Sequence, residues 1–171
     1  MVSELHNVTL NENVEVVVCP SFPYLAAFSA ASKSVNLSSA FSLGAQNLSE
    51  HTKGAFTGEI STSMLQEVGV NYVIVGHSER RSIYNESSAL VAKKVNAALT
   101  AGLKPILCIG ESEAERVANQ TEVVLAAQLQ PVIDEIGIEN FKDVVIAYEP
   151  VWAIGTGKTA SPEMAQATHQ F

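Results

Sequence analysis

Short, continuous apolar segments rich in β-branched residues recur along the chain and predict strands. There are five of them, at residues 14–18, 41–45, 72–75, 106–109 and 144–148. Their side chains do not alternate between polar and apolar, so we expect strands that are covered on both faces, as in a parallel sheet. Successive strand ends lie roughly 30–40 residues apart, which suits repeated strand–helix units.

Segments with helical spacing of apolar residues separate these strands. Residues 87–100 carry one apolar face, and a second helix is expected to begin with the Ser112–Glu115 capping box and to run to Ile136. Pro131 is expected to bend or interrupt that helix. Shorter helices are expected at residues 24–32 and 62–68, and a further helix is expected to begin at the Ser-Pro-Glu of residues 161–163.

The alternation of strands and helices predicts an α/β fold in a single domain that spans residues 1–171. Two architectures fit the pattern, a doubly wound sheet and a β/α barrel. No GxGxxG or GxxxxGK[ST] motif follows any strand, which argues against a nucleotide-binding fold.

Composition narrows the classes of partner. Charged residues make up 16% of the chain, against about 25% in an average globular protein, and the net charge is -8. We therefore expect no nucleic-acid partner and no anionic membrane surface, which would need clustered Lys and Arg. Cys19 and Cys108 lack metal-binding spacing and fit two buried thiols in a reducing compartment. Without a signal peptide or a long apolar span, the expected location is the cytoplasm.

Polar residues gather where the expected strands end, which is where active sites lie in both architectures. They are Gln46-Asn47, Gly76-His77-Ser78-Glu79, Gly110-Glu111 and Glu149-Pro150. His77 lies between a strand and a helix start, whose partial positive charge favours a neutral imidazole that can donate a hydrogen bond to a carbonyl oxygen. The alternative is a histidine that only caps the turn.

Glu149 directly follows a buried strand, so partial desolvation would make its carboxylate a better base. The alternative is an ordinary strand-end glutamate paired with Lys or Arg. The following residues, 150–160, read PVWAIGTGKTA and place a small, glycine-containing tip between stiffer ends. Such a segment is typical of a lid, and its glycines let backbone amides approach an anion. A plain connecting loop is the alternative.

Taken together, these segments resemble a known family. YVIVGHSERR at residues 72–81 and AYEPVWAIGTGKTA at 147–160 are similar to the two signature segments of the triosephosphate isomerases. GAQN at 44–47, GAFTGEIS at 54–61 and PILCIGE at 105–111 also match. The resemblance implies the eight-stranded (β/α)8 or TIM barrel, with the five strands of this chain matching the second to the sixth.

The resemblance also implies an activity, the interconversion of dihydroxyacetone phosphate and D-glyceraldehyde 3-phosphate in glycolysis and gluconeogenesis, without a metal or an organic cofactor. This family is itself a known example of catalytic tuning and of lid closure. Glu149 would be the base, His77 would polarise the substrate carbonyl, and Gly155 would offer its amide to the phosphate. Ser78 and Glu79 would support the site. The implied lid comprises Pro150, Val151, Trp152, Ala153, Ile154, Gly155, Thr156, Gly157, Lys158, Thr159 and Ala160.

A homodimer is implied as well. The loop around Thr57 resembles the family's loop that inserts into a neighbouring subunit, and Glu59 and Arg80 match an ion pair that braces it. The alternative is an exposed, glycine-rich turn.

A β/α barrel needs about 250 residues, and this chain has 171. By resemblance it lacks the first strand, which carries an Asn-x-Lys, and the last two β/α units. We therefore expect the 171-residue polypeptide alone to be inactive or nearly so. Two alternatives stay open: a different barrel enzyme that acts on a sugar phosphate, and an inactive remnant or assembly module of the same family.

Overall fold

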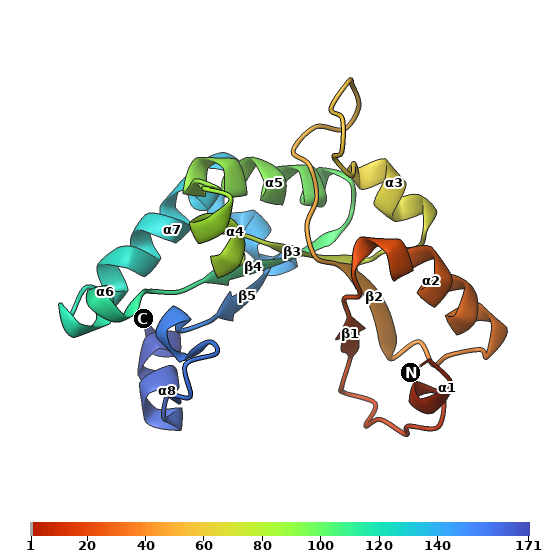
Figure 1. Cartoon of the computed structure of the whole chain (residues 1–171), viewed down its shortest axis with the longest axis horizontal. Coiled ribbons are helices and arrows are strands. Elements are labelled where there is room, and N and C mark those ends of the chain that lie inside the picture. The colour runs from red at the N-terminus through yellow and green to blue at the C-terminus, as the bar shows by residue number, and fades with distance from the viewer. Residues whose placement is uncertain (1) are drawn as a thin grey trace. The chain divides into compact units, whose positions relative to one another are not determined.

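The computed structural model describes residues 2–171, and Figure 1 labels their helices and strands. These residues group into two compact units. Unit 1 contains the residues up to 75 together with 96–105, and unit 2 contains residues 76–95 and 106–171. The single domain expected from the sequence stays a prediction.

Five strands form the sheet: β1 (Val16–Val18), β2 (Phe41–Ala45), β3 (Tyr72–Val75), β4 (Lys104–Ile109) and β5 (Val145–Tyr148). Their order in the sheet is the order in the chain, and the β1–β2, β2–β3 and β4–β5 pairs are parallel. A doubly wound sheet would reverse its order at a switch point. Uninterrupted chain order is instead that of consecutive units of a β/α barrel, so the fold class is that of a partial TIM barrel.

The burial of the strands corrects one expectation. Both faces are covered along β3 and most of β4. In β5, however, Val145 is 47% exposed and Ile146 is 43% exposed, and all three residues of β1 are only half-buried. The first and last strands of the sheet have a neighbour on one side only, so an apolar run there does not guarantee burial.

The helices of unit 1 are short. They are α1 (Val2–Leu5), α2 (Leu25–Ser34), which a 3-10 turn at Phe22–Tyr24 precedes, and α3 (Thr62–Glu67). The Ser61 hydroxyl caps α3 by accepting the Met64 N–H. Helix α5 (Ser88–Thr100) begins in unit 2 and ends in unit 1.

In unit 2, the long helix expected after Ser112 is two helices. The Ser112–Glu115 capping box is confirmed, but α6 ends at Val117 and α7 begins at Thr121 (Figure 1). Asn119 has a φ of 55°, a left-handed conformation that no helix can continue through.

Pro131 was expected to bend or interrupt this second helix. The prediction of an interruption is wrong. Helix α7 (Thr121–Ile136) contains Pro131 and continues for another turn beyond it. Leu125, Val132 and Ile136 are all buried. Their packing holds the helix together across the one hydrogen bond that proline cannot donate.

The remaining helices of unit 2 are α4 (Ser78–Ile83), α6 (Glu113–Val117), α8 (Pro162–Gln170) and the 3-10 segments Ile138–Asp143 and Val151–Ala153. The predicted start of α8 is confirmed, because Ser161 accepts the Met164 N–H and Pro162 occupies the first helical position.

Candidate active site

His77 lies where β3 gives way to α4. Gly76, with a φ of 73°, ends the strand, and His77 is the N-cap of the helix. Its Nδ1 accepts the backbone N–H of Glu79 at 3.3 Å. When an imidazole accepts at Nδ1, its proton is on Nε2. The histidine therefore does cap the turn, and the cap leaves Nε2 on the side that faces Glu149.

Glu149 faces this N–H from the end of β5. Its Oε2 lies 3.5 Å from His77 Nε2, and the Glu149 side chain is 35% exposed. Oε2 is buried and makes no hydrogen bond to any of residues 2–171. A carboxylate oxygen without a donor can accept a proton from a bound molecule, since no existing hydrogen bond has to break first.

A pocket of about 310 Å³ adjoins Glu149. Ser78 and Glu149 line it, together with Gly110 and Gln128. His77 does not line it, so the facing His77–Glu149 pair, and not this pocket, defines the candidate site.

A buried carboxylate organises the ends of β4 and β5. Glu111 has no exposed surface and accepts the Tyr148 hydroxyl with both oxygens, each at 3.1 Å. It also accepts the indole N–H of Trp152 at 3.0 Å and the Arg116 guanidinium at 3.3 Å. Burial and the Glu111 charge together raise the pKa of Tyr148, which keeps its hydroxyl a donor. The sequence placed Glu111 at a strand end but gave it no role.

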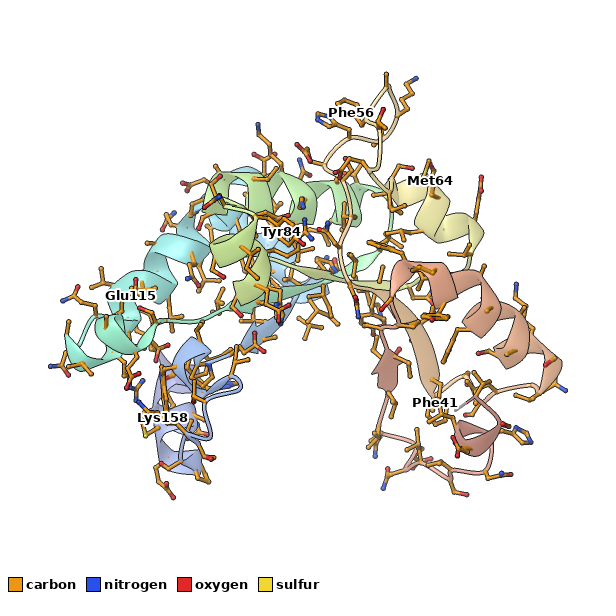
Figure 2. The ribbon with its side chains drawn as sticks, in the orientation of Figure 1. Phe41, Phe56, Met64, Tyr84, Glu115 and Lys158 are labelled. Carbon is orange, nitrogen blue, oxygen red and sulfur yellow. The ribbon has the colours of Figure 1, made fainter. Side chains whose placement is uncertain are left out.

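The segment predicted as a lid is anchored at both ends and exposed at its tip. Trp152, at its start, is bonded to Glu111, and the Thr156 hydroxyl donates to the Trp152 carbonyl at 2.8 Å. Near its end, Lys158 forms an ion pair with Glu113 at the start of α6 (Figure 2 labels Lys158). Gly155, between these anchors, is exposed and has a φ of 66°. An exposed tip between anchored ends is the arrangement that a lid needs.

Arg81, to which the sequence gave no role, joins the ends of two strands. Its guanidinium donates to the carbonyls of Gly76 at 2.7 Å and Cys108 at 3.3 Å, and to the Ser88 hydroxyl at 3.1 Å. Burial lowers the pKa of Arg81. A Cβ on Gly76 would lie 2.8 Å from Arg81 Nη2, and the Gly76 φ of 73° is one that other residues rarely adopt, so both observations favour glycine before His77.

Arg80 has a partner within unit 2. Its Nε donates to Glu86 Oε1 at 2.6 Å, and its guanidinium lies over the Tyr84 ring, 4.8 Å from the centroid. The pairing of Arg80 with Glu59 stays a prediction. Glu79 is exposed, with its Oε2 3.7 Å from His77 Nδ1.

Residues 2–171 contain no cluster of three or more His, Cys, Asp or Glu side chains that could bind a metal ion. In the same stretch, none of the helices has the length and apolar character needed to cross a membrane.

Comparison with known proteins identifies the family. The family model for triosephosphate isomerase matches residues 1–171. The chain is 68% identical over all of its 171 residues to the triosephosphate isomerase of Colwellia psychrerythraea, of which it covers 67%. It is 59% identical over 160 residues to that of Thiobacillus denitrificans, which corresponds to 94% of this chain and 63% of the relative. The chain thus spans about two-thirds of the length of these relatives. Over that whole span, the match is close enough that the chain belongs to the triosephosphate isomerase family.

Proposed function

We propose that this protein interconverts dihydroxyacetone phosphate and D-glyceraldehyde 3-phosphate through an enediolate intermediate, as a step of glycolysis and gluconeogenesis. The observation that carries the proposal is the 3.5 Å separation of His77 Nε2 and Glu149 Oε2. One atom is an N–H donor and the other is an acceptor without a hydrogen bond among residues 2–171. A hydroxycarbonyl substrate bound beside the two atoms, in contact with both, would meet a base at its carbon and a donor at its oxygen.

Proton transfer then follows from the two side chains. Glu149 removes a proton from the carbon next to the carbonyl and returns it to the other carbon. The His77 N–H donates to the carbonyl oxygen and stabilises the charge that develops there. Ser78 and Glu79 would support the site as the first residues of α4, where the Glu79 N–H fixes the imidazole through Nδ1.

The lid would retain the intermediate. Its exposed tip at Gly155 would present a backbone amide to the substrate phosphate, while the Trp152–Glu111 bond holds its first turn. Closure over the phosphate would exclude water from the enediolate.

The proposal extends to assembly and location. We propose a homodimer in which the loop around Thr57 contacts a second copy. Thr57 and Glu59 are both exposed in unit 1 and available for such a contact. We also propose the cytoplasm as the location, where a phosphorylated three-carbon substrate would be the partner.

The test uses a hybrid, in which residues 1–171 replace the aligned stretch of the Colwellia psychrerythraea relative. The hybrid is expected to interconvert the two triose phosphates, and Glu149→Gln to lower kcat by about 10²–10⁴-fold, the usual range for a general base. Glu139→Gln, at an exposed glutamate, is the matched control and should leave kcat unchanged. A hybrid without turnover, or one indifferent to Glu149→Gln, would refute the proposal and leave the inactive module as the function. The low activity expected of the 171-residue polypeptide alone stays a prediction, which the same assay tests.

A further inference from the structure

Gln128, in the middle of α7, uses its whole side-chain amide on the backbone of one residue. Its Oε1 accepts the N–H of Gly110 at 2.9 Å, and its Nε2 donates to the carbonyl of Gly110 at 2.9 Å. Gly110 follows directly after the last residue of β4. At this point the side chain supplies the paired donor and acceptor that a neighbouring strand supplies within a sheet.

Gly110 in turn lies directly against the backbone of Glu149. The Glu149 N–H donates to the Ile109 carbonyl at 2.8 Å, and the Val151 N–H donates to the Glu111 carbonyl at 3.1 Å. These two hydrogen bonds flank Gly110. A Cβ on Gly110 would overlap the Glu149 carbonyl oxygen and lie 2.9 Å from the Glu149 carbonyl carbon. The bare backbone of Gly110 therefore sets how closely the Glu149 backbone can approach.

Gln128, Gly110 and Glu149 form a chain of contacts from helix α7 to the carboxylate. We call this chain the mechanical path. Helix α7 is held by the buried side chains of Leu125 and Val132, on either side of Gln128. The amide transmits this fixed position to Gly110, and contact transmits it to Glu149, whose Oε2 stands 3.5 Å from His77 Nε2.

We propose that Gln128 is a positioning residue for the base, which it holds through Gly110 in its place facing His77. The inference rests on the proposed isomerase activity. The positioning role requires an amide side chain, because only an amide offers a donor and an acceptor together in the geometry of a peptide group. Glutamate would keep the acceptor and lose the donor, and methionine would keep the shape and lose both.

The test compares Gln128→Met with the parent in the hybrid enzyme. Gln128→Met is expected to lower kcat by roughly 10–100-fold, since a misplacement of about 1 Å costs up to that much. KM should stay within about threefold of the parent value, because the substitution does not touch the contacts that bind the substrate. With substrate deuterated at the carbon that loses its proton, the primary isotope effect on kcat should increase, because a misplaced base makes proton removal rate-limiting. Gln128→Glu should also have a lower kcat than the parent, because glutamate cannot donate to the Gly110 carbonyl.

Gln130→Met is the matched control, with the same substitution two residues along the same helix. Gln130 is exposed and donates to Asp134 at 2.7 Å. It should leave kcat and the isotope effect unchanged. A partly unfolded variant would lose active enzyme without any change in the isotope effect, so the isotope effect separates positioning from stability.

Amide hydrogen exchange, in the 171-residue chain and in the hybrid, provides a readout that does not depend on turnover. Gln128→Met should accelerate exchange of the Gly110 and Glu149 N–H groups, and Gln130→Met should not. If exchange at Glu149 is unchanged, or kcat and the isotope effect match those of the parent, the positioning role is wrong. If the parent hybrid lacks turnover while exchange responds as stated, the proposed function fails and the mechanical path stands.

Discussion

At the scale of the residue, Glu86 lies at the centre of a buried cluster of charges. Its side chain is 5% exposed, and its Oε1 accepts Lys94 Nζ and Arg80 Nε, both at 2.6 Å. Burial acts to raise the pKa of Glu86, but the hydrogen bonds from Lys94 and Arg80 outweigh it, so the net pKa is lowered. The folded state thus favours the charged carboxylate, and its stability depends on pH.

Replacing Glu86 should therefore cost a pH-dependent amount of stability. A carboxylate whose folded pKa is depressed contributes stability above its unfolded pKa, near 4.5, and loses it as the pH falls through the folded value. At neutral pH, Glu86→Gln should lower the free energy of unfolding by about 3 kcal/mol, because it leaves Lys94 and Arg80 without their anion. The gap between parent and variant should narrow in acid.

Urea unfolding followed from neutral to acidic pH measures this gap. Glu139→Gln, at an exposed glutamate, should change stability by less than about 0.5 kcal/mol at any pH. A Glu86→Gln gap that stays constant in acid would show that the charge of Glu86 is not what stabilises the fold.

What the sequence could predict at this scale depends on distance along the chain. His77 and Glu149 were singled out because each directly follows an apolar run that predicts a strand. Gln128 could not be identified from the sequence, because its partner Gly110 lies 18 residues away. In sequence, a glutamine within a helix looks like any other polar surface residue. The roles assigned to His77 and Glu149 stay predictions until activity is measured.

At the scale of the element, the break between α6 and α7 shows how a local conformation ends a helix. Asn119 adopts a left-handed conformation, with a φ of 55°. The apolar spacing on either side is helical, so the pattern alone predicted one continuous helix. A single left-handed residue leaves that spacing nearly intact, and asparagine adopts this conformation at low cost, so the break carries no strong sequence signal.

Asn119 should therefore tolerate glycine but not valine. Glycine reaches a positive φ without a steric penalty, so Asn119→Gly should leave the free energy of unfolding within about 0.5 kcal/mol of the parent. Asn119→Val should lower it by about 1–2 kcal/mol, because a β-branched side chain clashes in this conformation. Urea unfolding of the two variants tests this. Equal stabilities would mean that the left-handed conformation is not present in solution.

At the scale of the whole molecule, the loop between β2 and α3 is the proposed contact with a second copy. Figure 2 shows Phe56 near the tip of this loop. The Phe56 ring stacks on His51, with centroids 3.8 Å apart and planes within 4°, and it is still 42% exposed. An exposed aromatic residue at a loop tip is typical of an interface.

Phe56→Asp should consequently weaken self-association. In sedimentation velocity, the hybrid is expected to be a dimer and the Phe56→Asp hybrid to shift towards monomer, because a charge would be desolvated at the contact. Val117→Asp is the control, since Val117 is 77% exposed at the end of α6 and outside this loop. A variant that stays dimeric at every concentration would place the contact elsewhere.

At this scale, the fold class could be predicted from the sequence. Five apolar runs predicted five strands, and all five predicted ranges match the structure to within two residues at each end. The strand–helix pattern by itself left the order of those strands open, because a barrel and a doubly wound sheet share it. The resemblance of residues 72–81 and 147–160 to a known family implied the barrel, and the pairing of strands in chain order agrees with it.

The measurement that tests the account most directly is a double-mutant cycle on the hybrid, with Glu149→Gln, His77→Gln and the two combined. If the two side chains act on one substrate across 3.5 Å, the parent turns over triose phosphates, each single variant loses most of kcat, and the double variant loses far less than the product of the two losses. Losses that simply multiply would show that the residues act independently. A parent without turnover, or single variants with the parent's kcat, would contradict the account.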